Sequence, residues 1–131
     1  MELLEKYIKE MGVDVELSEF EMKDVQMKLP AIKHKWIGRL VRHKGELERY
    51  QENRSTTLKN VAQEIIDTAT YQVTLASAQK AAEKHKSVKR VDENIKEHKL
   101  IIDFLEKSEK IFTSMSFDIK NIIEIMKLET M

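Results

Sequence analysis

Hydrophobic residues recur every three, four or seven positions along most of the chain, which is the spacing of an amphipathic α-helix. The longest pattern follows Pro30 and, at ~100° per residue, keeps to one stripe about 80° wide. A stripe this narrow is typical of a coiled-coil seam, although some of its members are polar. The stripe consists of Trp36, Leu40, His43, Leu47, Tyr50, Arg54, Leu58, Val61 and Ile65.

Shorter elements are predicted before this pattern. Apolar residues at helical spacing up to Met11 predict one short helix, with Gly12 as its C-terminal cap. The alternation in Val13–Leu17 fits a short extended segment, and Ser18–Glu21 resembles a capping box that opens a second short helix. We expect Pro30 to end that second helix and to occupy the first turn of the next.

The long pattern after Pro30 does not decide whether the segment is one continuous helix. Gly45 or Ser55–Thr57 are candidate positions for a bend or break, and the pattern weakens toward the alanine-rich stretch Ala76–Ala82. The sequence therefore predicts either one very long helix or two joined helices. Ser87 is the candidate N-cap of a further helix.

The C-terminal part repeats the seam and then becomes apolar on several sides. From Val88 to Leu105 the apolar spacings alternate between three and four, as in a heptad repeat. The last segment is apolar around almost the whole helix, so it requires more than one neighbour, and a subunit interface is the expected one. The predicted oligomerisation residues are Phe117, Ile119, Ile122, Ile123, Ile125 and Met126, with Leu128 beside them.

Composition favours the all-α class, with long helices and coiled-coil-like seams. The 131 residues include three glycines and one proline, too few for a turn-rich β-fold, and 41% are hydrophobic while 35% are charged. We expect one helical domain over residues 1–131. It would comprise short N-terminal helices over 1–29, a long basic helical region over 30–86 and a C-terminal oligomerisation region over 87–131.

The sequence offers little for catalysis or cofactor binding. Cysteine is absent, and neither a Gly-rich phosphate loop nor a nucleophile motif occurs. Four histidines are scattered without a carboxylate partner at metal-ligand spacing, and those on apolar stripes are expected to be core residues. We therefore expect no enzyme, no cofactor and no metal. The histidines are His34, His43, His85 and His98.

No signal peptide or apolar run of the ~20 residues needed for a membrane span is apparent, which favours a soluble intracellular protein. The net charge is zero, but the charges are segregated: residues 31–59 carry 8 basic against 3 acidic groups. A basic stripe of this kind can face a polyanion, although a solvated helix face explains the charges equally well. Aromatic stacking of bases is less favoured than core packing for Trp36 and Tyr50.

The candidate nucleic-acid-binding residues flank the stripe or lie within it. Lys35, Arg42 and Arg49 are seven residues apart and project within about 40° of one another on a helix. Repeated cations match a phosphate backbone that is charged at every nucleotide. Arg54 sits within the stripe and has an ion pair as its alternative role. The full set is Lys35, Arg39, Arg42, Arg49, Arg54 and Lys59, and a second basic cluster contains Lys84, Lys86, Lys89 and Arg90.

Two blocks of the chain resemble the UvsY family, the recombination mediators of T-even-type bacteriophages. One runs from Lys35-Trp36 to Leu58-Lys59; the other begins at Arg90-Val91-Asp92 and continues through Ile102-Asp103-Phe104 to Phe117–Ile122. The blocks cover roughly half of the chain, with length, order and spacing carrying the match rather than any single motif. The N-terminal part matches poorly.

The resemblance implies a non-enzymatic helical protein that assembles through its C-terminal helices into a ring of about six or seven subunits. It also implies three partners: single-stranded DNA, a RecA-type recombinase, and the single-strand-binding protein that coats the strand. The localisation would be the host cytoplasm if the gene is carried by a phage. The alternative is a coiled-coil scaffold whose charges serve only solubility.

One motif departs from the family pattern. The family's Leu-Lys-x-Arg DNA-contacting motif aligns with Leu58-Lys59-Asn60-Val61. The resemblance therefore carries the lysine over to Lys59, whereas an apolar residue stands where the family has arginine. Arg42, Arg49 or Arg54 would have to supply the missing charge.

Overall fold

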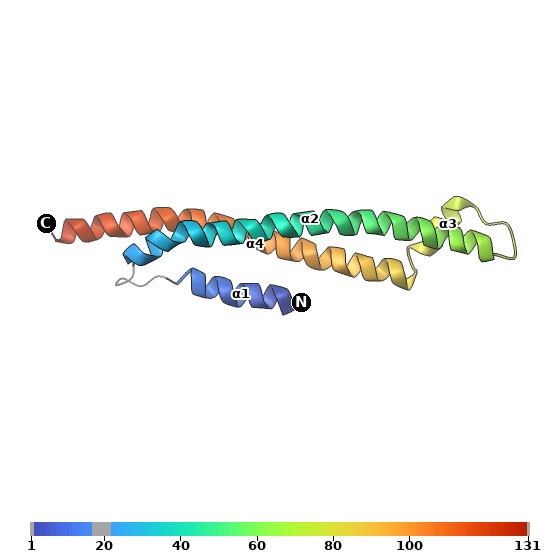
Figure 1. The fold of residues 1–131 in the computed structure, drawn as a ribbon, viewed down its shortest axis with the longest axis horizontal. Coiled ribbons are helices and arrows are strands. Elements are labelled where there is room, and N and C mark those ends of the chain that lie inside the picture. Colours follow the sequence, from blue (N-terminus) through green and yellow to red (C-terminus); the bar gives the residue numbers. More distant parts are fainter. Residues whose placement is uncertain (1, 17–21, 131) are drawn as a thin grey trace. The chain divides into compact units, whose positions relative to one another are not determined.

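The computed structural model describes residues 2–16 and 22–130, and the elements it contains there are all helices. In chain order these are α1 (Glu2–Asp14), α2 (Met22–Thr68), α3 (Leu75–Ala82) and α4 (Lys86–Glu129), as Figure 1 shows. The prediction of the all-α class with long helices is confirmed. None of the described helices is both long enough and apolar enough to cross a membrane.

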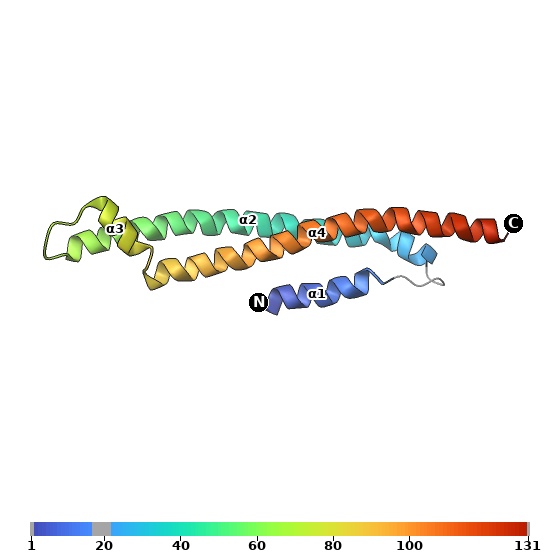
Figure 2. The ribbon, with the colours of Figure 1, turned by 180° about the vertical axis from the view of Figure 1, so that it is seen from behind.

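The chain forms two compact units. The first contains the residues up to Arg42 together with those from Leu100 onward, and the second contains His43–Lys99. Figure 2 shows, from behind, the same long α2 and α4 helices that contribute segments to both units. The single domain over residues 1–131 stays a prediction, although the region boundary placed at residue 30 falls inside α2.

Helix α2 passes through Pro30, so the prediction that this proline separates two helices is wrong. A proline inside a helix removes one backbone hydrogen bond and costs ~3 kcal/mol. The turns before it bury Met22 and Leu29, which are 6% and 4% exposed, and this burial offsets the cost. The helix also runs without a break through Gly45 and Ser55–Thr57, the two candidate interruptions.

Helix α1 continues past the glycine predicted to end it. It reaches Asp14, and no described residue has a positive φ, so Gly12 is not a left-handed cap. The extended segment predicted over Val13–Leu17 is wrong at its start, because Val13 and Asp14 are helical. The predicted capping box at Ser18–Glu21 lies outside the described residues.

The core of the second unit includes the short, alanine-rich helix α3. Helix α2 ends at Thr68, and α3 begins after Thr74, whose Oγ1 accepts a hydrogen bond from the Ser77 N–H at 3.2 Å. Because alanine side chains are short, α3 approaches its neighbours closely. The resulting core contains Val61, Ala62, Ala78, Ala82 and Val88.

Helix α4 begins at Lys86, one residue before Ser87, the position predicted as its cap. His85 Nδ1 accepts the Ser87 N–H at 3.2 Å, and the His85 carbonyl accepts the Lys89 N–H at 3.0 Å. The cap is therefore His85, and Ser87 lies in the first turn. The predicted heptad seam of α4 is confirmed by its burial, with Val91 and Ile95 in the second unit and Ile102 and Leu105 in the first. Buried apolar residues continue beyond it at Phe112 and Ile119.

Candidate nucleic-acid interface

Arg42, Arg49 and Lys59 are exposed cations of α2. Within residues 2–16 and 22–130, no hydrogen bond or ion pair engages any of the three. Arg49 borders a shallow depression of about 370 Å³ that Glu46, Tyr50 and Asn53 also line. Ten residues of helix turn Lys59 ~80° away from Arg49, so these two side chains do not form a single row. They are nevertheless available to an anion.

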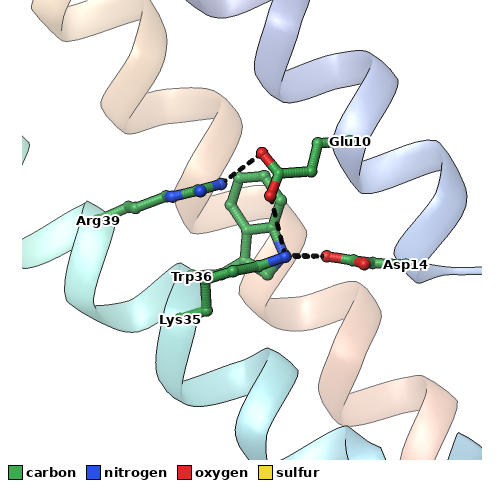
Figure 3. Close-up of polar contacts among 5 residues, drawn as sticks. All are labelled: Glu10, Asp14, Lys35, Trp36 and Arg39. Carbon is green, nitrogen blue, oxygen red and sulfur yellow. Dashed lines mark hydrogen bonds and ion pairs between the residues drawn. The ribbon is translucent and has the colours of Figure 1, made fainter.

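Lys35 and Arg39 are placed quite differently, because two carboxylates of α1 bind them (Figure 3). The Glu10 carboxylate accepts hydrogen bonds from Arg39 Nη1 at 2.7 Å and from Lys35 Nζ at 3.1 Å. Asp14 accepts Lys35 Nζ at 2.6 Å and the indole N–H of Trp36 at 2.8 Å. We call these five residues the α1 clamp.

Aromatic contacts reinforce the α1 clamp. The Tyr7 and Trp36 rings meet edge to face, with centroids 5.5 Å apart and planes at 87°. The Arg39 guanidinium lies 4.6 Å from the Trp36 centroid and 4.9 Å from that of Tyr7. Trp36 is 3% exposed, so the expectation that it packs in the core rather than stacking on bases is confirmed.

The ion pairs of the clamp stabilise the charged forms of its members. The hydrogen bond from Arg39 is the main cause that lowers the pKa of Glu10 below its ordinary 4.5. Burial opposes the charge of Lys35, but its hydrogen bonds to Asp14 and Glu10 outweigh this and raise the Lys35 pKa above 10.5. Lys35 and Arg39 are thus already neutralised within the chain.

Arg54, in the second unit, is also paired. Its Nε donates to Asp92 Oδ1 of α4 at 2.5 Å, and this hydrogen bond raises the pKa of the guanidinium against the effect of burial. The ion pair that the sequence allowed as an alternative is therefore present. The second basic cluster lies around the start of α4 in the same unit. Its four side chains, Lys84, Lys86, Lys89 and Arg90, are all exposed.

The predicted oligomerisation residues divide between two faces of α4 in the first unit. Ile119 is fully buried, and Ile122, Ile123 and Met126 are half-buried. Phe117, Ile125 and Leu128 are 65%, 55% and 70% exposed. At ~100° per residue, these three fall on the side of the helix opposite Ile119. The exposed three are called the tail face below.

Two features of this arrangement were missed in the sequence. The acidic pair Glu10 and Asp14 and the basic pair Lys35 and Arg39 both have i, i+4 spacing, so their complementarity was available as a signal. The histidines are not scattered either: His43 and His98 meet in the second unit, with Glu46 one turn beyond His43. Such a group is one that can hold a metal ion.

Comparison with known proteins gives a match in structure only. No protein-family profile and no curated protein sequence match the chain. A crystal structure of the bacteriophage T4 recombination mediator protein UvsY superposes with a TM-score of 0.83 and 21% identity, covering 96% of this chain and 98% of that one. A second crystal form of UvsY gives 0.81 and 19%, covering 98% of both chains. The chain therefore resembles UvsY and shares its fold over nearly its whole length.

Proposed function

We propose that this protein is a recombination mediator: it binds single-stranded DNA and promotes the loading of a RecA-type recombinase onto strands coated by single-strand-binding protein. The observation that carries this proposal is the fold shared with a recombination mediator over 96% of the chain. The role is one of binding and assembly, without catalysis.

The proposed DNA contact is the exposed part of α2. Arg42, Arg49 and Lys59 are the predicted cations that no acidic partner in the described chain neutralises. Each cation that replaces a counterion on a phosphate contributes to affinity without regard to base identity. Lys35 and Arg39 serve instead to hold α1, and Arg54 to hold Asp92. Lys59 is also the position to which the family resemblance assigns a DNA contact.

The proposed assembly is a homo-oligomer of about six or seven subunits formed through the C-terminal helices. The tail face supports it, since three large apolar side chains on one side of α4 are costly to leave in water. A subunit contributes few phosphate contacts, so its own affinity for DNA is weak. A closed oligomer makes later contacts intramolecular, and the avidity gain reaches ~10²–10⁴.

Such multivalent binding would bend or wrap the strand. A wrapped strand disfavours an extended filament of single-strand-binding protein and presents its backbone to a recombinase. Both proteins are therefore proposed partners, together with the strand itself.

The salt dependence of single-strand binding tests this proposal against a scaffold without a nucleic-acid role. The assembled protein should bind a fluorescent oligonucleotide with an affinity that falls as salt rises. Arg49→Ala should weaken binding and reduce the slope of log K against log salt by ~0.7 for each subunit that contacts the strand. Lys9→Ala, which removes an exposed cation from α1, is the matched control and should leave the slope unchanged. Absence of salt-dependent binding by the wild type would favour the scaffold.

A further inference from the structure

Three potential metal ligands converge in the second unit. His43 and Glu46 lie on α2 in an i, i+3 relation, which places both on one face of the helix. His98 projects from α4 toward them. One ligand atom from each side chain lies within 4.8 Å of the other two.

The distances approach those of a tetrahedral metal site. The Nδ1 atoms of His43 and His98 are 3.1 Å apart, and each is 3.8 Å from Glu46 Oε2. Bonds of ~2.0–2.1 Å at tetrahedral angles require ligand atoms about 3.3–3.4 Å apart. The two nitrogens already meet this requirement within a few tenths of an ångström. The carboxylate must move ~0.5 Å, which its half-exposed side chain allows, since 40% of it is accessible.

Burial and ring contacts hold the two histidine side chains in place. The side chains of His43 and His98 are 5% and 14% exposed, and the Tyr50 ring lies over His98 with centroids 4.9 Å apart. Both histidines occupy seam positions where apolar residues are usual. Without a metal, one imidazole donates a hydrogen bond to the other. With a metal, both Nδ1 atoms and the carboxylate are satisfied together.

We propose that His43, Glu46 and His98 form a binding site for a borderline divalent transition metal, with Zn²⁺ as the ion of choice. Two imidazoles and one carboxylate suit Zn²⁺, whereas Mg²⁺ and Ca²⁺ prefer oxygen ligands throughout. Helical bundles build metal sites in this way, from an i, i+3 pair on one helix and a residue on a facing helix. Water takes the fourth position, and the ion links α2 to α4 within the second unit.

The test titrates the 131-residue chain, first stripped with a chelator, with Zn²⁺ by calorimetry and with Co²⁺ by visible absorption. We expect one ion per chain, the absorption bands of a tetrahedral Co²⁺ site, and a Zn²⁺-dependent rise in the unfolding midpoint. Glu46→Gln and His98→Gln should each lower the Zn²⁺ affinity at least about tenfold. His34→Gln, an exposed histidine of α2 outside the cluster, is the control and should bind as the wild type does.

Two results would overturn the proposal. One is the absence of one-to-one binding in the wild type. The other is unchanged Zn²⁺ binding in Glu46→Gln. Because the Glu46 side chain is half-exposed, this variant should keep the fold, and circular dichroism can verify that it does. In either case the two histidines are a hydrogen-bonded pair, and any bound ion is adventitious.

Discussion

Replacing Asp14 by alanine should destabilise the first unit far more than removing another acidic group from α1. Asp14 is 16% exposed and accepts hydrogen bonds from Lys35 and from Trp36, whose indole is almost fully buried. Loss of a charge-assisted hydrogen bond costs ~1.5–3 kcal/mol, and an indole N–H left without an acceptor costs ~1–3 kcal/mol. Because the two effects overlap, we expect a total of about 2–4 kcal/mol.

Urea denaturation followed by tryptophan fluorescence measures this effect, because the chain has a single tryptophan and it lies in the clamp. Glu2→Ala is the control: it removes the same charge from an exposed position of the same helix. Its effect should stay within ~0.5 kcal/mol. If Asp14→Ala and Glu2→Ala behave alike, α1 is not held by these contacts, and the neutralisation of Lys35 by α1 is wrong.

Three further predictions follow from the electrostatics and burial. The pKa of Glu10 is lowered in the folded chain, so its ion pairs stabilise the fold above pH 4.5, and this stabilisation is lost as the pH falls below 4.5. An acid titration followed by tryptophan fluorescence should therefore show the contacts between α1 and α2 weakening below pH 4.5. Arg54→Ala should lower the urea midpoint while leaving the salt slope of DNA binding as in the wild type, because Asp92 already holds this guanidinium. Ile119→Ala should cost ~2–5 kcal/mol of stability, whereas Phe117→Ser should change the assembly mass without loss of helicity, as analytical ultracentrifugation with circular dichroism can verify.

Periodicity predicted the fold well because burial here follows the helical repeat. The stripe through Trp36, Leu40 and Val61 is buried as expected, and so is the α4 seam. Local signals failed where tertiary packing overrode them. Pro30 was expected to end a helix, but the apolar burial around it keeps α2 continuous.

The candidate site was harder to predict because exposure depends on partners distant in sequence. Lys35 and Arg49 look alike in the sequence, yet Glu10 and Asp14 neutralise only the first. His43 and His98 are 55 residues apart, so no local spacing could reveal their contact. Likewise, the apolar tail indicated an interface, but only the structure distinguishes its buried side from the tail face.

The lag before recombinase activity on coated single strands tests the proposed mediator role most directly. The measurement follows ATP hydrolysis by a RecA-type recombinase on single-stranded DNA that single-strand-binding protein already covers. Wild-type protein should shorten the lag. A variant with serine at all three tail-face positions should shorten it only slightly at equal subunit concentration, because without assembly it cannot bind the strand multivalently. A wild-type protein that leaves the lag unchanged would contradict the proposed function, and a tail-face variant that shortens it fully would contradict the role of assembly.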